Sequence, residues 1–219
     1  MDLTRYSSLR ELSLRVTPIE ERFNLRTPPS LERFTLEGPF ANIFPQPEEI
    51  KFPSHNLHTI STRGSDSIRF LAYGIRQGLN KETLRRVVMA DFVTYNNVAG
   101  RLIGSDLNLL RSIPGSEVFQ NVKTLALKDD NILDHDIVVI HSLFPAVESL
   151  EIEAPRITEA FVSELVRLPD SKVMNVTLRN CTEVSENVVR WAQSRKVSVR
   201  LVRQAWQNDV SVGQRVRYG

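Results

Sequence analysis

The sequence contains a single cysteine, Cys181, in 219 residues. One thiol cannot form an intramolecular disulfide, so we expect a protein that folds in a reducing compartment, cytoplasmic or nuclear. No apolar run approaches the roughly 18 residues that cross a bilayer. The N-terminal residues, Met1 to Arg15, carry charges where a secretory signal has a continuous apolar core. We therefore expect no membrane partner.

Signatures of catalysis and cofactor binding are also missing. The chain has no nucleophile elbow, no P-loop and no dinucleotide-binding glycine fingerprint. Its histidines, His55, His58, His135 and His141, lack the cysteine pair or fourth ligand that a closed zinc site needs. The sequence therefore predicts a non-enzymatic protein with no cofactor and no metal site.

Charge is nearly balanced overall, at +2, but it is unevenly distributed. Basic residues dominate from Arg190 to Gly219, where Asp209 is the only acid. Such a segment can attract nucleic acid, but it matches no RNA-module signature. We interpret residues 204–219 as a solvated basic C-terminal tail, and nucleic acid is not the expected partner.

A repeat is the strongest feature that is present. Apolar residues recur at positions 1, 4 and 6 of a short segment, and the first residues of successive copies lie 22, 26, 27, 38, 25 and 26 residues apart. The copies are Leu9-Leu12-Leu14, Leu31-Phe34-Leu36, Leu57-Ile60-Thr62, Leu84-Val87-Met89, Val122-Leu125-Leu127, Val147-Leu150-Ile152 and Val173-Val176-Leu178, with a degenerate eighth through Val197, Val199 and Leu201.

The spacing matches that of leucine-rich repeats. Positions 4 and 6 point the same way on an extended strand, so stacked parallel strands bury a continuous apolar row. The sequence predicts an α/β leucine-rich-repeat solenoid over residues 1–203, with about seven to eight repeats. We expect a curved parallel sheet on its concave side, and helices and irregular segments on its convex side. The 38-residue interval indicates an insertion around residues 92–120.

Helical returns are predicted mainly in the C-terminal half. Asp134, Thr158 and Ser185 are placed to cap helices, and a further helix is expected after Ser67. The inward residues of the three capped helices are expected to be Ile137, Val138, Ile140 and Leu143; then Phe161, Val162, Leu165 and Leu168, with Ile157 as a staple; then Val188, Val189 and Trp191. Prolines such as Pro28, Pro29, Pro45, Pro47 and Pro53 favour extended connections in the first two returns.

The segment from Val173 through Cys181 to Ala192 resembles the cysteine-containing leucine-rich repeat, L-x-x-L-x-L-x-x-C followed by a turn and a capped helix. Repeats of this kind occur in F-box proteins, especially those of fungi. The resemblance implies the substrate-recruiting part of a cullin-type ubiquitin ligase. No F-box segment is found in the chain, and the repeats begin at Leu9. The cullin-ligase adaptor is therefore an expected partner only if an F-box lies outside this chain.

Two alternatives to the ligase interpretation stay open. One is a repeat-only scaffold or regulator without a ubiquitin link. The other is a GTPase-activating protein of the leucine-rich type, although nothing singles out an arginine for that role. For Cys181, we expect structural burial rather than a reactive thiol.

The candidate binding surface is the concave sheet. Side chains at positions 3, 5 and 7 alternate away from the core, so they line this surface. The face could also be merely solvated. The residues predicted to bind a protein partner are Arg15, Arg33, Arg63, Arg86, Lys128, Glu151, Glu153 and Arg179.

Overall fold

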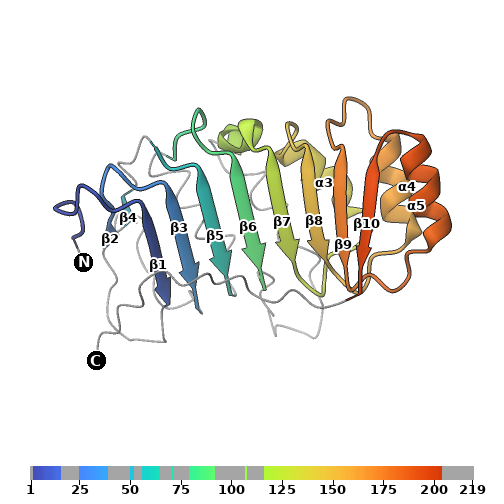
Figure 1. Ribbon diagram of the computed structural model, residues 1–219, viewed down its shortest axis with the longest axis horizontal. Helices are drawn as coiled ribbons and strands as arrows, with labels where there is room; N and C mark the ends of the chain where they lie inside the picture. Colours follow the sequence, from blue (N-terminus) through green and yellow to red (C-terminus); the bar gives the residue numbers. More distant parts are fainter. Residues whose placement is uncertain are drawn as a thin grey trace, which may run out of the picture.

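The computed structural model describes residues 2–15, 25–38, 50–51, 56–64, 71, 79–91, 107 and 116–203. An eight-stranded sheet dominates this part of the chain (Figure 1). All its strands are parallel, and spatial neighbours follow one another in the sequence. They are β1 (Glu11–Arg15), β3 (Arg33–Glu37), β5 (Thr59–Arg63), β6 (Arg86–Ala90), β7 (Thr124–Lys128), β8 (Ser149–Glu153), β9 (Asn175–Arg179) and β10 (Ser198–Val202).

The strand register places equivalent repeat positions opposite one another. Position 4 forms one row across the sheet and position 6 forms a second. The first row is Leu12, Phe34, Ile60, Val87, Leu125, Leu150, Val176 and Val199; the second is Leu14, Leu36, Thr62, Met89, Leu127, Ile152, Leu178 and Leu201. The predicted register is confirmed in every copy, including the eighth.

A ladder of backbone hydrogen bonds accompanies this register at the start of six of the eight strands. The carbonyl of His58, at position 2, accepts hydrogen bonds from the N–H groups of Arg85 and Arg86, both at 2.9 Å. The same two-donor arrangement recurs at the carbonyls of Arg10, Glu32, Arg85, Lys123 and Glu148. These bonds involve only main-chain atoms, so they join successive repeats in the register that the buried apolar rows select.

Residues at position 8 end several strands in the left-handed region. Gly38 and Gly64 have φ of 138° and 124°, and Asp91 and Asn180 have φ of 53° and 54°. A Cβ atom on Gly64 would lie 2.1 Å from the carbonyl oxygen of Gly38, so only glycine fits there. Asparagine and aspartate tolerate the left-handed conformation better than most residues, which explains their use at the equivalent sites.

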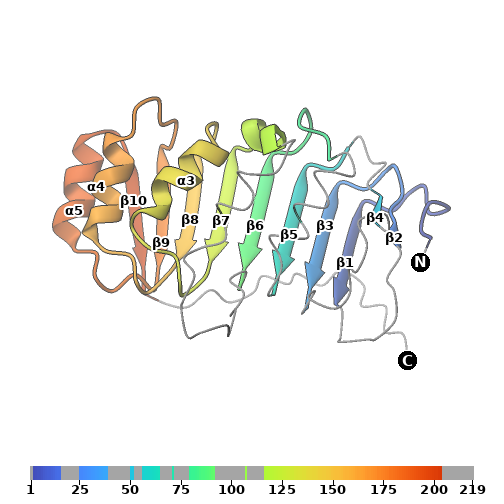
Figure 2. The ribbon, with the colours of Figure 1, turned by 180° about the vertical axis from the view of Figure 1, so that it is seen from behind.

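Helices cover one side of the sheet. Figures 1 and 2 show α3 (Asp136–Leu143), α4 (Glu159–Arg167) and α5 (Glu186–Ser194) on the same side. A 3₁₀-helix, η1 (Ser116–Asn121), precedes β7. Side chains alternate along a strand, so positions 4 and 6 face these helices and positions 3, 5 and 7 face away from them. We call the side formed by positions 3, 5 and 7 the open face.

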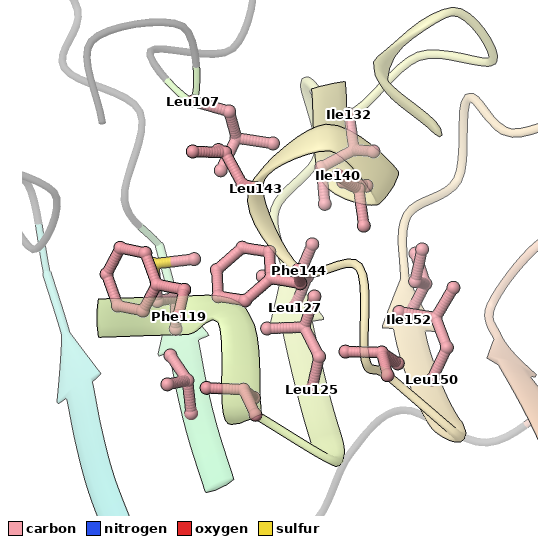
Figure 3. Packing of buried hydrophobic residues seen from close by; sticks show 14 of the residues in the cluster. Leu107, Phe119, Leu125, Leu127, Ile132, Ile140, Leu143, Phe144, Leu150 and Ile152 are labelled. Carbon is pink, nitrogen blue, oxygen red and sulfur yellow. The ribbon is translucent and has the colours of Figure 1, made fainter. Parts of the chain in front are cut away.

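The core lies between the sheet and these helices. Phe119 and Phe144 each stand three residues before position 1 of their repeats, and their ring centroids are 4.9 Å apart. Both rings are buried in the cluster that Figure 3 shows. The two rings add a tilted aromatic contact to the apolar rows at positions 4 and 6.

The capping predictions had different outcomes. Thr158 is confirmed as an N-cap, since its Oγ1 accepts from the Ala160 N–H at 3.1 Å. The prediction for Asp134 was wrong: α3 starts after His135, and the Asp134 carboxylate instead accepts from the N–H of Thr158 at 2.8 Å and from its hydroxyl at 2.6 Å. Ser185 does precede α5, but its side chain makes no capping hydrogen bond.

The inward faces of the helices are largely as predicted. Val138 is the exception, because it is 46% exposed on the outer side of α3. Leu168 and Trp191 are only partly buried, although both pack against the core. The other predicted inward residues, including Ile157, are buried.

Few connections in the N-terminal half lie within the described residues. Two short extended segments, β2 (Leu25–Arg26) and β4 (Ile50–Lys51), pair in parallel, as expected for the proline-containing returns. Leu71 and Leu107 are helical and fully buried. The rest of the helix predicted after Ser67, most of the insertion at 92–120 and the tail at 204–219 lie outside the described residues.

Candidate interaction surface

The open face carries all eight predicted binding residues. Arg15, Arg33 and Arg86 are exposed, and Arg63, Lys128, Glu151 and Arg179 are half-buried. Glu153 is only 6% exposed, which makes it the most deeply buried of the set. The strands thus bring the candidates onto one surface, but they spread them from the first strand to the penultimate one.

Ion pairs within the face neutralise most of its cations. Arg33 Nη1 lies 2.7 Å from Glu11 Oε1, and Lys128 Nζ lies 3.2 Å from Glu153 Oε1. Arg179 also pairs through Nε with Glu151. These pairs join neighbouring strands, so the three cations add little net positive charge to the face.

Asp91 is a partner that the repeat pattern did not identify. Arg63 Nε donates to Asp91 Oδ2 at 2.9 Å. Asp91 directly follows β6, and its N–H donates to the Lys128 carbonyl at 2.8 Å. The signal that could have found it is the acid at position 8, the turn position occupied by glycine in the two preceding repeats.

Three cations of the face are exposed and unpaired: Arg15 on β1, Arg86 on β6 and Arg200 on β10. No carboxylate among the described residues lies within ion-pair distance of them. Arg86 stands at the start of β6. The register places Thr59 and Thr124 on either side of it. The preceding Arg85 is also exposed, and its guanidinium donates to the carbonyls of Glu82 and Leu84. The uncompensated positive charge of the described face is therefore distributed over β1, the start of β6 and β10.

The middle of the open face offers little apolar area. Val88, Ala90 and Ala126 are the outward residues there, and they are 8%, 6% and 1% exposed. Hot spots of protein interfaces usually include a large aromatic or arginine anchor. A partner would therefore have to be recognised mainly through polar groups at this surface.

Cys181 is buried, as predicted. Its Sγ lies 3.2 Å from the carbonyl oxygen of Arg179. Burial raises the pKa of the Cys181 thiol, and the nearby charge of Glu153 raises it further, while a backbone hydrogen bond at Ala154 lowers it. A thiol in this setting stays protonated and unreactive near neutral pH.

A cavity of about 240 Å³ lies beside Cys181, at the C-terminal end of the described sheet. Leu178, Val184 and Leu201 form its apolar lining. This volume is below the roughly 300–1,000 Å³ of typical ligand pockets. No cluster of three metal-ligating side chains occurs within the described ranges. In the same part of the chain, no helix is long and apolar enough to span a membrane.

These features define an α/β protein with one all-parallel sheet whose strands follow sequence order. No protein-family model matches the chain, and no curated protein matches it either.

Proposed function

We propose that the chain is a leucine-rich-repeat solenoid that binds a protein partner without catalysing a reaction, as the substrate-recognition part of an F-box-type ubiquitin ligase. One observation carries this proposal. Eight parallel strands in sequential order present their outward side chains as one continuous, mostly polar surface. Extended surfaces of this kind are what stacked repeats use for binding.

The repeat arrangement supports the choice of class. The apolar rows at positions 4 and 6 cross all eight strands, and the backbone ladder at position 2 joins six successive strand pairs. The repeat that contains Cys181 has its strand, turn and helix α5 in the predicted order. The link to a ubiquitin ligase rests on the resemblance of that repeat to those of F-box proteins.

Site-specific photo-crosslinking tests the binding surface. A photoreactive amino acid replaces Ser61 or Thr124 on the open face, and matched probes replace Val138 and Arg190 on the helices. In a eukaryotic lysate, we expect partner cross-links from the first pair only, measured by mass shift and peptide sequencing. Cross-links that came mainly from Val138 and Arg190 would contradict the proposal.

Co-purification tests the ligase link separately. The full-length gene product, including any residues beyond this chain, is expressed with the cullin-ligase adaptor. A stoichiometric complex is expected if the protein recruits ligase substrates. Recovery of the cross-linked partner without the adaptor would support a repeat-only scaffold instead.

A further inference from the structure

We propose that the outer edge of β10 is a second interaction surface, which binds an extended segment of another protein by strand addition. The segment that fits this edge has alternating acidic and apolar residues. The surface is the end of the sheet and not its open face, so the inference goes beyond the proposed function and does not depend on it.

The main chain of β10 is paired on one side only. Figure 1 shows β10 at the end of the described sheet, where β9 is its neighbour. The Val202 carbonyl accepts from the Asn180 N–H at 3.0 Å, so it points toward β9. Backbone groups alternate in direction along a strand of a parallel sheet. Those of Val199 and Leu201 therefore point to the outer edge, where no described residue pairs with them.

An exposed edge of this kind can accept one more strand. In strand addition, main-chain hydrogen bonds supply affinity and alternate side chains supply specificity. The partner would continue the ladder that already joins the repeats. Its charge and apolar pattern can be inferred from the side chains around β10.

The end of the sheet at β10 is basic. Residues 190–203 contain no acid, and their five cations are all exposed: Arg190, Arg195, Lys196, Arg200 and Arg203. None of the five lies within ion-pair distance of a carboxylate of the described residues. Charged side chains keep unwanted strands from pairing with a sheet edge. These cations therefore repel basic strands, whereas they attract a segment that carries carboxylates.

The opposite edge of the sheet, at β1, has no such excess. Arg10 Nη1 lies 3.3 Å from Glu32 Oε1. Arg33 Nη1 lies 2.7 Å from Glu11 Oε1. Because acids and cations are paired with one another beside β1, that edge does not select an acidic partner.

Apolar residues of the partner have a place beside β10. Leu201, at position 6, is only partly buried, so the apolar row ends there incompletely covered. The cavity of about 240 Å³ at this end is lined by Leu178, Val184 and Leu201, and Arg203 also contributes to its wall. Side chains alternate along a strand. A segment that alternates in chemistry can therefore direct apolar residues to this cavity and carboxylates to the cations.

Charge also favours this occupant over two others. Residues 204–219 carry Arg215 and Arg217 against Asp209. The β1 edge of a second copy would bring the exposed Arg10 and Arg15 to the cations of β10. Both have a net positive charge beside a basic edge, which disfavours pairing.

Fluorescence anisotropy with the full chain tests the surface. The probe is a labelled synthetic peptide of alternating glutamate and valine. One comparison peptide has lysine in place of glutamate, and the other is the acidic peptide with N-methylated amides, which cannot donate hydrogen bonds. We expect the acidic peptide to bind at least about tenfold more tightly than the lysine peptide, and N-methylation to abolish binding.

The cations are tested by a triple substitution. Arg195→Gln, Arg200→Gln and Arg203→Gln together should weaken binding of the acidic peptide by about tenfold. The matched control combines three exposed arginines of other repeats, Arg5→Gln, Arg85→Gln and Arg156→Gln. It removes the same charge and should leave the affinity unchanged. Equal losses for the two triple variants would overturn the inference, as would equal binding of the acidic peptide and either comparison peptide.

A photoreactive amino acid in place of Ser198 identifies what occupies the edge. Ser198 is exposed at the start of β10. With the acidic peptide present, we expect cross-links to that peptide, measured by mass shift and peptide sequencing. Cross-links mainly to residues 204–219 would assign the edge to the chain's own tail, and cross-links mainly between two chains would assign it to self-association. Either result would overturn the inference.

Discussion

The two halves of the sheet have the same strand register, but their apolar residues are buried to different extents. In the C-terminal half, the sheet lies against α3, α4, α5 and the Phe119–Phe144 pair (Figure 2), and the apolar residues of β7 and β8 are almost fully buried. At the N-terminal end, Leu9, Leu12 and Leu14 of the first repeat are only partly buried. Nevertheless, the backbone ladder is the same in both halves. The apolar rows thus select the same register in both halves, whereas local stability depends on what covers these rows.

The largest expected difference between the halves comes from removing a core ring. Phe144→Ala deletes a fully buried side chain and its contact with Phe119, so we expect a loss of about 3–5 kcal/mol in the free energy of unfolding. Leu12→Ala removes a partly buried side chain of the first strand and should cost about 1–2 kcal/mol. Urea denaturation followed by circular dichroism measures both. Equal losses would mean that the two ends are equally well packed.

A smaller loss of stability is expected when the hydrogen bonds between Asp134 and Thr158, which join neighbouring C-terminal repeats, are removed. Asp134→Ala removes two hydrogen bonds to Thr158 and should cost about 1–2 kcal/mol. Ser185→Ala is the control, since the Ser185 side chain makes no capping bond and its loss should cost less than about 0.5 kcal/mol. Thermal unfolding of the two variants gives the comparison. A lower melting temperature for Ser185→Ala than for Asp134→Ala would contradict the stabilising role of the Asp134–Thr158 hydrogen bonds.

The smallest effect concerns a polar side chain in the apolar row of the N-terminal half. Thr62 is fully buried at position 6, and its Oγ1 has no hydrogen-bond partner among the described residues. Thr62→Val replaces the hydroxyl with a methyl group of similar size, so we expect stabilisation by about 1 kcal/mol. Thr62→Ser keeps the hydroxyl and should destabilise. A lower denaturation midpoint for Thr62→Val than for the parent chain would refute the unpaired assignment.

The sheet could be predicted from the sequence because its determinants are local and repeated. Residues such as Val122, Leu125 and Leu127 specify both the strand and the face that it buries. The role of Asp134 could not be predicted, because its partner, Thr158, lies one repeat away. A sequence pattern shows that a carboxylate can cap the following helix, but not that a neighbouring hydroxyl competes for it.

The candidate surface was predicted as a set of residues but not as a charge distribution. Alternation along the strands identifies Arg63 and Arg86 as outward residues equally well. Only the fold shows that Arg63 donates to Asp91, whereas Arg86 stands between two threonines. Pairing across strands depends on side-chain reach and on turn residues such as Asp91, neither of which follows from the repeat period.

The backbone ladder also dictates where this chain can carry proline. Positions 2 and 3 donate their N–H groups between repeats, and proline has no N–H to give. The eleven prolines of the chain all lie outside the eight strands and outside these positions. The sheet thus restricts the residue types at a few positions of each repeat. The connecting segments can change in length and composition. Such a chain can diverge extensively between its strands while the strands remain in register.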